Sequence, residues 1–494
     1  MPCPKLVWVP YMAVTLSIRK SLIYSYLDRY ASLAISILSS MVIARLLTPE
    51  DIGVFSVTMV LISFVATVRD LGAGQYLVQE KELTTDRIRA VWAVQLGLGL
   101  LLAILVVIGS FPIASFYKEP RMQHIMLLVA ANYAINPFGS LTYAWQMREM
   151  RFDALAIVRF TSTLAGAVVG IYMAWTGHGP ISLAYGSLAT TLTNALMAVF
   201  YRPRDFPWLP GFKEIRRVLA FGSRLTGSSI LQTISGSAPE LLLGKLQNMT
   251  SVGLFSRASG LVAMFNRMVL EGMHVVAISW FAKQLRQNNN ISDPFLAATC
   301  YATALGWAFC LGLMCLAQPV IRVMYGHQWD DAVDLTRLIA FSLACALPAA
   351  LCQPALMAKG SVTRMLRVNV QTTALTVALI AIGACFSLMA MGLCVALAAA
   401  LRSWLWLAAA HKEVDFTWSA LLSQSLSSAT VAAASAIGPL CALWVYGPYP
   451  AESWQPLLLG VPTAFAGFLL SIILCKHPLL DEIKPMWAKI RKFS

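Results

Sequence analysis

The chain has 494 residues, of which 58% are hydrophobic and only 12% are charged. A soluble protein cannot bury that much apolar surface, so the composition excludes a soluble enzyme or binding domain and predicts a polytopic membrane protein. The formal net charge of +14 does not indicate nucleic-acid binding, because the basic residues lie between hydrophobic runs, where they set membrane topology.

The N-terminal segment, residues 1–20, has a short apolar run with no small-residue cleavage site after it, so we expect no secretory signal. Proline interrupts several of the hydrophobic runs that follow, as at Pro137, Pro239 and Pro348, and membrane helices tolerate this. Fourteen membrane spans are predicted, near residues 22–45, 51–70, 90–111, 124–145, 156–176, 180–200, 218–243, 252–281, 296–318, 333–356, 368–389, 391–410, 419–446 and 456–475.

The distribution of Lys and Arg predicts the orientation of these spans. With the N-terminus inside, 26 basic residues fall in cytoplasmic segments and 5 fall outside, and such a bias fixes topology. An even number of spans places both termini in the cytoplasm. The predicted division of the chain is a cytoplasmic segment (1–20), an N-terminal lobe of six spans with its loop (21–217), a C-terminal lobe of six spans (218–411), two further spans (412–475) and a basic cytoplasmic tail (476–494).

An internal repeat supports the two lobes. A shift of 200 residues aligns the end of the first span and the start of the second with the end of the seventh and the start of the eighth. A further echo, near an offset of 208, pairs Tyr117 with Tyr325. Chance matching between apolar sequences is the alternative, but the matches fall at equivalent topological positions. Repeats in the same orientation are related by an axis along the membrane normal, with the substrate path between them. The matched pairs are Arg45 and Lys245, Leu46 and Leu246, Gly53 and Gly253, Phe55 and Phe255, Ser56 and Ser256, and Leu61 and Leu261.

Charged residues occur inside the predicted spans, where they are costly. An Arg at the bilayer centre costs about 2.5–3.5 kcal/mol on insertion scales, so such residues usually face a partner or a wet cavity. On a regular α-helix, Arg257, Arg267, Glu271 and His274 share a face about 100° wide. The alternative is a structural role for these charges, in which Arg267 forms an ion pair with Glu271 and Arg257 extends to the lipid headgroups of the outer leaflet.

Two further spans carry embedded charges at corresponding places in the repeat. The first span contains Asp28 and Arg29 within a polar arc, and the seventh contains Arg224. Three of the four helices that begin the two lobes therefore hold a cation. This is what a cavity for an anionic substrate would require.

Cysteine and histidine give little support for metal or disulfide chemistry. The ten cysteines form no C-x-x-C, and most lie in apolar runs, where they act as small hydrophobes. The six histidines are scattered and form no H-E-x-x-H. We expect no cofactor and no metal, and H+ and Na+ stay open as coupling ions.

Five motifs, in order, resemble polysaccharide exporters of the MOP superfamily over roughly residues 20–410. They are ARLLTPEDIGVFS, RDLGAGQYLVQEKELT, GKLQNMTSVGLFSRASGL, VMYGHQWDDAVDLTRLIAFS and ALMAKGSVTRMLRVNV. The resemblance is to bacterial flippases for undecaprenyl-diphosphate-linked O-antigen or exopolysaccharide repeat units. It implies an all-α fold with two six-helix lobes in a V related by pseudo-twofold symmetry, two extra C-terminal helices, and alternating access without ATP hydrolysis.

The resemblance also suggests functional roles for individual residues, and at one position this chain departs from the family pattern. Asp28, Arg29 and Arg257 occupy places comparable to functional residues of lipid II flippases. One position departs from the family pattern, since Pro239 stands where members often have Asp, and the acid here is Glu240. This departure weakens any assignment of cation coupling to Glu240.

The predicted function is therefore a flippase of the bacterial inner membrane, a transporter rather than an enzyme, acting on an undecaprenyl-diphosphate-linked glycan. Membrane lipids, a polysaccharide polymerase and chain-length proteins are the candidate partners. A drug/cation antiporter on the same fold and, less favoured, a membrane glycosyltransferase or polymerase are the alternatives. Substrate binding is assigned to Arg257, Arg29, Arg224 and Arg267, and coupling or gating to Asp28, Glu271 and Glu240.

Overall fold

The computed structural model describes residues 30–69, 74, 76–77, 80, 83–202, 206–207, 209–287, 289–447 and 454–481, and within these it describes only the backbone of residues 67–69, 216–217 and 219–232. Every regular element in this part of the chain is a helix, and it contains no strand. The chain divides into two compact units, Met1–Thr233 and Ile234–Ser494. The division falls within one long helix, α8 (Ile215–Leu246).

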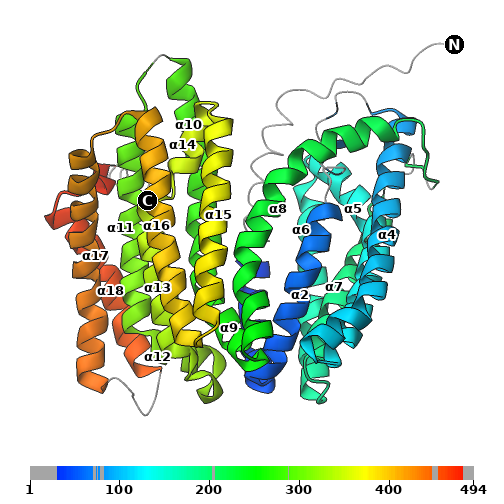
Figure 1. The fold of residues 1–494 in the computed structure, drawn as a ribbon, viewed down its shortest axis with the longest axis horizontal. Coiled ribbons are helices and arrows are strands. Elements are labelled where there is room, and N and C mark those ends of the chain that lie inside the picture. Colours follow the sequence, from blue (N-terminus) through cyan, green and yellow to red (C-terminus); the bar gives the residue numbers. More distant parts are fainter. Residues whose placement is uncertain are drawn as a thin grey trace, which may run out of the picture. The chain divides into compact units, whose positions relative to one another are not determined.

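The first unit is a bundle of long helices (Figure 1). Its α5 packs against α4 and α7, and α6 packs against α7. Small residues allow the last contact: a Cβ on Gly186 would lie 2.9 Å from the Gly166 carbonyl oxygen and 3.2 Å from the Cα of Gly170, and membrane helices commonly pack closely through such residues. The helices are Tyr30–Leu46, α2 (Pro49–Arg69), α4 (Thr85–Tyr117), α5 (Arg121–Arg148), α6 (Phe152–Trp175), α7 (Ile181–Phe200) and the first part of α8.

The second unit begins within α8 and contains two interrupted segments. The segment after α8 is α9 (Met249–Phe265), a π turn η1 (Asn266–Leu270) and α10 (Glu271–Arg286). The other interrupted segment is α13 (Ala332–Ala346), the 3-10 turn η3 (Leu347–Ala349) and α14 (Cys352–Ala358). The remaining elements are α11 (Ser292–Cys315), α12 (Ala317–Tyr325), η2 (His327–Trp329), α15 (Val362–Ala384), α16 (Leu388–Val414), α17 (Trp418–Tyr446) and α18 (Gln455–Leu474).

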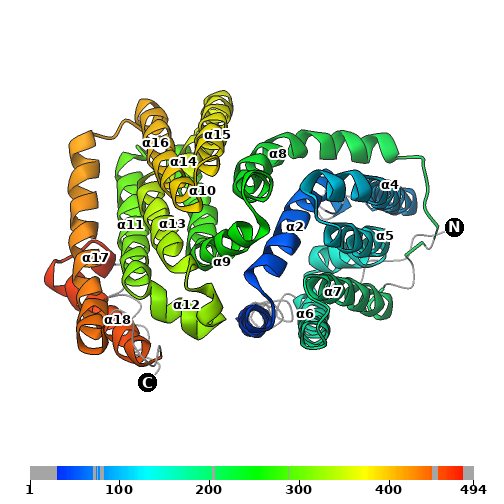
Figure 2. The same cartoon turned by 60° about the horizontal axis from the view of Figure 1, so that its bottom comes forward.

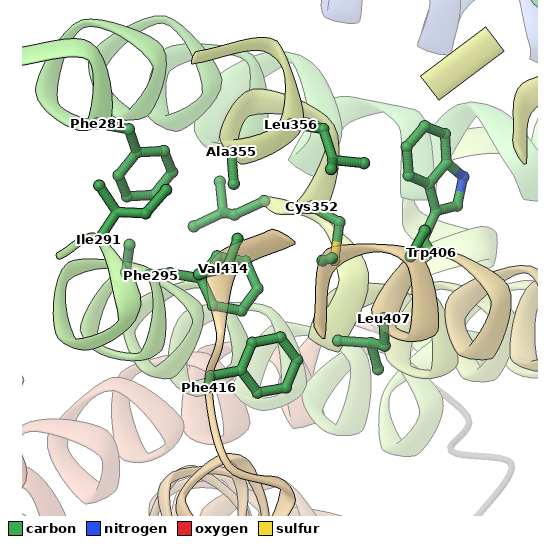
Figure 3. Packing of buried hydrophobic residues seen from close by; sticks show 14 of the residues in the cluster. Phe281, Ile291, Phe295, Cys352, Ala355, Leu356, Trp406, Leu407, Val414 and Phe416 are labelled. Atoms are coloured by element: carbon green, nitrogen blue, oxygen red, sulfur yellow. The ribbon is translucent and has the colours of Figure 1, made fainter. Parts of the chain in front are cut away.

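A buried aromatic cluster fixes one end of the second unit. The ring of Phe295 in α11 lies 6.5 Å from that of Phe281 in α10 and 5.2 Å from that of Phe416, which follows α16. All three side chains are at most 1% exposed. Figure 3 shows these rings with Ile291 and Val414 around them. Burying such rings stabilises the join between helices that are far apart in the sequence.

Twelve described helices are long and apolar enough to cross a membrane. They correspond in order to twelve of the fourteen predicted spans, so the prediction of a multi-pass, all-helical membrane protein is confirmed. The first predicted span falls partly outside the described residues, which contain only Tyr30–Leu46 of it. The seventh falls on α8, which is 32 residues long but more polar. The total of fourteen stays a prediction.

The two units repeat the same local structures. The chain leaves a helix at residues 47–48 and again at 247–248, and a polar side chain caps the next helix each time. Thr48 accepts a hydrogen bond from the backbone N–H of Asp51 at 3.2 Å, and Asn248 accepts one from Ser251 at 2.8 Å. Capping of this kind satisfies a helix N–H group that has no partner within the helix. The offset of 200 found in the sequence is therefore also an offset between equivalent helix starts.

A second repeated structure follows α5 and α14. Met150 and Gly360, which are 210 residues apart, both have positive φ, 54° and 72°. The next backbone N–H bonds back in the same way each time, from Arg151 to the Gln146 carbonyl at 2.9 Å and from Ser361 to the Leu356 carbonyl at 3.0 Å. This is a left-handed helix end. It occurs at the two basic segments that the sequence places in the cytoplasm.

Candidate functional site

The structure describes only some of the predicted site residues. The side chains of Arg257, Arg267, Glu240 and Glu271 lie within the described part of the second unit. Asp28 and Arg29 lie outside the described residues, and Arg224 lies in a stretch of α8 whose side chains are not described. The candidate site that can be built from contacts therefore centres on Arg257.

Arg257 lies in α9, eight residues after its first residue, Met249, which places it about 12 Å along the helix. Its guanidinium carbon lies 5.3 Å from the ring centre of Tyr325 and 5.8 Å from that of Trp329. The rings are 3% and 0% exposed, so both contacts are largely shielded from solvent. Cation–π contacts are worth about 2 kcal/mol or more when desolvated. The two aromatic rings thus hold an arginine inside a membrane helix.

The connection between α12 and α13 supplies both rings. Tyr325 is the last residue of α12, and Gly326 then turns the chain with φ of 97°. Arg322 closes the connection by donating from Nε and Nη2 to the two carboxylate oxygens of Asp330, at 2.8 and 2.7 Å. A bidentate pair of this type fixes geometry as well as charge. Figure 2 shows α12 next to α9. Helix α13 also packs against α9.

The corresponding corner of the first unit is built differently. There Arg121, at the start of α5, donates to Glu50 and Asp51 at the start of α2 and to Glu119 in the connection before it. The Arg121 guanidinium holds the pKa of Glu119 below its ordinary value. The residue that aligns with Arg257 is Val57, which is fully buried. Arg257 and its two rings therefore have no counterpart at the aligned position of the first unit.

The segment after Arg257 departs from the predicted geometry. The common face of Arg257, Arg267, Glu271 and His274 assumes a continuous α-helix, and this assumption is wrong beyond Phe265 because η1 is a π turn. A π turn contains one extra residue, which displaces the following residues by about 100° around the axis. Arg267 and Glu271 are exposed, whereas His274 is partly buried. Nothing in the sequence marks the extra residue.

Arg402 is a second embedded cation, which the sequence analysis does not single out. On α16 it lies within about 40° of the buried residues Met391, Ala398 and Ala409, and about 160° from the exposed Trp404. It therefore faces the interior of the second unit. Within the described residues no ion pair or hydrogen bond holds it. Its position in the middle of a span, on the packed side, is the signal that could have found it.

Metal chemistry finds no candidate among the described residues, where no three His, Cys, Asp or Glu side chains gather as a metal site would need. The arrangement around Arg257 instead suits an anion. Cation–π contacts use the charge of the guanidinium, and guanidinium N–H groups are the kind of donor that binds carboxylate or phosphate. Aromatic rings that fix the side chain also reduce the rotamer entropy lost on binding.

Comparisons with known proteins show which solved structures share this architecture. In the solved structures, lipid II flippase MurJ in an inward closed conformation has a TM-score of 0.75 at 13% identity, covering 93% of this chain and 100% of MurJ. An inward-facing multidrug resistance MATE family transporter of the MOP superfamily has a TM-score of 0.63 at 15% identity, covering 80% of this chain and 96% of that one. At these identities the likeness establishes a shared fold.

Similar sequences come from polysaccharide pathways. Succinoglycan biosynthesis transport protein ExoT of Rhizobium meliloti (strain 1021) is 24% identical over 329 residues, which are 66% of this chain and 66% of ExoT. An uncharacterized membrane protein in the cps region of Klebsiella pneumoniae is 22% identical over 361 residues, 72% of this chain and 74% of that protein. Lipopolysaccharide biosynthesis protein WzxC of Escherichia coli (strain K12) is 21% identical over 303 residues, 60% and 61% of the two chains.

A family model described as "Polysaccharide biosynthesis protein" matches residues 42–334, more than half of the chain. The prediction of a transporter of the MOP superfamily, rather than an enzyme, is confirmed by these comparisons. The chain belongs to the polysaccharide biosynthesis protein family.

Proposed function

We propose that this protein is a flippase that moves an undecaprenyl-diphosphate-linked oligosaccharide repeat unit across the bacterial inner membrane by alternating access. Its product feeds O-antigen or exopolysaccharide synthesis. The membership of the polysaccharide biosynthesis family supports the glycan part of the substrate. The likeness to transporters in fold supports movement rather than chemistry.

The observation that carries the diphosphate assignment is Arg257 in its aromatic setting. A diphosphate offers the planar guanidinium of a membrane-embedded arginine bidentate acceptors, and their attraction offsets part of the cost of desolvation. Two unit charges 4 Å apart attract by about 4 kcal/mol at an effective dielectric constant of 20. A few such contacts offset part of the cost of drawing a charged headgroup into the membrane.

Arg29, Arg224 and Arg267 are proposed as further contacts for the headgroup, and Asp28, Glu271 and Glu240 as coupling or gating groups. We assign the protein to the inner membrane with both termini in the cytoplasm. A polysaccharide polymerase and chain-length proteins would receive its product at the outer leaflet of the inner membrane.

Deleting the gene in the source bacterium tests the proposal. The expected result is loss of surface or secreted polysaccharide, with lipid-linked repeat units accumulating in the inner leaflet, where membrane-impermeant periodate cannot oxidise them in spheroplasts. A plasmid copy should restore both. Normal polysaccharide together with increased sensitivity to cationic drugs would instead favour an antiporter and overturn the flippase.

A further inference from the structure

The two parts of the interrupted segment α9–η1–α10 are held in different ways. Helix α10 packs against α11 and α14, and its Phe281 belongs to the aromatic cluster with Phe295 and Phe416, whose side chains are at most 1% exposed (Figure 3). Helix α9 packs against α13. No hydrophobic effect drives helices together in lipid, so specific contacts have a large share in deciding where an apolar helix such as α9 lies.

Two specific contacts fasten α9 at a distance from the π turn. The guanidinium carbon of Arg257 lies 5.3 Å from the ring centre of Tyr325 and 5.8 Å from that of Trp329. In the turn before α9, Gln247 donates from Nε2 to the carbonyl of Ala384 in α15 at 3.0 Å. A guanidinium and a side-chain amide also donate to anions and water, so both contacts can be exchanged for others.

The π turn provides a place where the segment can bend. Phe265, the last residue of α9, stacks on Phe309 of α11 with ring centres 4.7 Å apart, and this fixes the inner end of α9. The next residues, Asn266, Arg267 and Met268, are exposed. Helices commonly bend at π turns. Since α9 has 17 residues, it is a lever about 25 Å long, and a bend of about 10° would move its first turn by about 4 Å.

The other interruption, η3 between α13 and α14, is fastened to α11. Pro348 lacks an N–H group, so it removes the hydrogen bond to the carbonyl of Ala344, and Trp307 of α11 donates to that carbonyl from Nε1 at 2.8 Å. Leu347 lies so close to Gly306 of α11 that a Cβ there would be 2.7 Å from its Cδ2. We therefore expect α13 and α14 to stay in place when α9 bends at η1.

We propose that α9 is a movable arm of the second unit, hinged at η1 and latched where Arg257 lies against Tyr325 and Trp329. A diphosphate paired with the guanidinium neutralises the charge that attracts the rings. Binding therefore weakens the latch and favours a conformation in which the arm has bent away. This inference rests on the proposed function, for which it says how binding of the headgroup at Arg257 becomes movement.

The arm can be followed by double electron–electron resonance on the full protein in lipid nanodiscs. One nitroxide is attached to p-acetylphenylalanine at the exposed Thr250, in the first turn of α9, and the other at Val445 in α17. Helix α17 is the reference because it packs against α11. A second pair, at the exposed Val275 in α10 and Leu422 in α17, reports on the anchored part.

The latch is tested without any ligand by Arg257→Met, which removes the charge and keeps a long side chain. The Thr250–Val445 distances should gain a second population, and the Val275–Leu422 distances should stay as in the natural protein. Trp307→Phe is the matched control, since it loosens η3 and leaves the latch in place, so both pairs should keep their natural distances. An unchanged first pair in Arg257→Met, or a shift of both pairs, would overturn the latch.

The hinge is tested by deleting Met268 in the Arg257→Met protein. The deletion removes the extra residue of the π turn, so α9 and α10 join as one continuous α-helix and each keeps its packed face. The second population of the Thr250–Val445 pair should then disappear. Met268→Ala, which keeps the length of the turn, should leave it. A second population that persists after the deletion, with an unchanged reference pair, would refute the hinge.

The link to the substrate is tested on the natural protein with undecaprenyl diphosphate in the nanodiscs. This lipid should populate the second Thr250–Val445 distance, whereas undecaprenol, which has the same prenyl chain and no charge, should not. In Arg257→Met the same lipid should change nothing further. No response of the natural protein would overturn the exchange of rings for diphosphate. Normal polysaccharide in a gene deletion would refute the flippase and leave the Arg257→Met result standing.

Discussion

At the scale of single residues, Arg257 shows what the sequence can and cannot predict. Its hydrophobic surroundings in the sequence mark it as an embedded cation that needs a reason to be there. Its aromatic neighbours Tyr325 and Trp329 are 68 and 72 positions further along, and such a contact depends on tertiary packing that no local pattern encodes. The motif VMYGHQWDD, which contains both rings, resembles a family motif, but the sequence alone does not indicate that it contacts Arg257.

The aromatic contacts change how Arg257 must be tested. Arg stacks on aromatic rings better than Lys does, so loss of function in Arg257→Lys alone fits either phosphate binding or support of the α12–α13 connection. Trp329→Phe keeps an aromatic ring against the guanidinium and serves as the control for the second role. Asp330→Asn weakens the bond between Arg322 and residue 330 that closes the α12–α13 connection, and it leaves Arg257 in place.

We predict that Arg257→Lys and Arg257→Ala both abolish export and accumulate lipid-linked units in the inner leaflet, at unchanged protein level. Trp329→Phe should retain most of the activity, because the arginine keeps a ring contact. Extraction and sugar labelling of the lipid-linked pool measure the accumulation, and immunoblotting measures the protein. Full export in Arg257→Lys would mean that Arg257 only extends its charge to the outer headgroups. Arg29 and Arg224 would then be the better candidates for binding the diphosphate.

At the scale of elements, the boundaries of helices were more predictable than their interiors. The starts at Thr48 and Asn248 follow from capping residues at equivalent places in the repeat. The interruption at Pro348 is visible in the sequence, but the donor to its freed carbonyl, Trp307, is not. The π turn at Asn266–Leu270 has no sequence marker. An extra residue in a helix depends on how neighbouring helices pack around it.

The end of α18 is held by a polar cluster that the sequence did not indicate. His477, which is 1% exposed, lies with its Nε2 3.2 Å from the Sγ of Cys300 in α11 and 3.5 Å from the Oγ of Ser428 in α17. Its Nδ1 accepts the backbone N–H of Leu479 at 3.2 Å. The cluster joins three helices through one imidazole that is neutral when Nδ1 accepts.

The cluster should make thermal stability depend on pH. Burial lowers the pKa of His477 from its ordinary value, which is about 6.5. As the pH falls below this value, the unfolded chain takes up a proton that the folded chain excludes, so the contribution is complete above about pH 6.5 and is lost on acidification. The unfolding midpoint of the purified protein in detergent should fall between pH 7.5 and pH 5.5.

His477→Asn is the control, since its amide oxygen can accept the Leu479 N–H but has no charge change in this range. The variant should be less stable than the natural protein at pH 7.5 and should approach it at pH 5.5. Other titrating groups affect both proteins alike, so the difference isolates His477. A difference that is constant with pH would contradict the prediction.

At the scale of the whole molecule, hydrophobic runs predicted the order of the helices well. Twelve described helices fall where spans were expected, because a span of about 20 apolar residues is a strong signal. The polar arcs of the first and seventh spans, with Asp28, Arg29 and Arg224, weaken that signal. The residues that make those helices interesting for function therefore also make their spans harder to count.

The orientation of the spans is predicted by charge alone, and it fixes which end of each unit meets which leaflet. With 26 basic residues in one set of loops and 5 in the other, the Tyr201–Arg217 connection is predicted to lie in the cytoplasm. The short turn at Lys118 that joins α4 to α5 is predicted to lie outside. In this predicted orientation the ring contacts of Arg257 are near the outer leaflet, because α9 starts and α12 ends on that side.

We predict that alkaline phosphatase fused after Arg217, which is active only outside the cytoplasm, is inactive there and active when fused after Lys118. Green fluorescent protein, which folds only in the cytoplasm, should give the opposite pattern at the two sites. The paired reporters control for poor expression, since each site must score positive with one of them. An active phosphatase after Arg217 would mean an odd number of spans before it. It would move Arg257 and its aromatic rings to the cytoplasmic side, where they would meet the diphosphate at loading rather than at release.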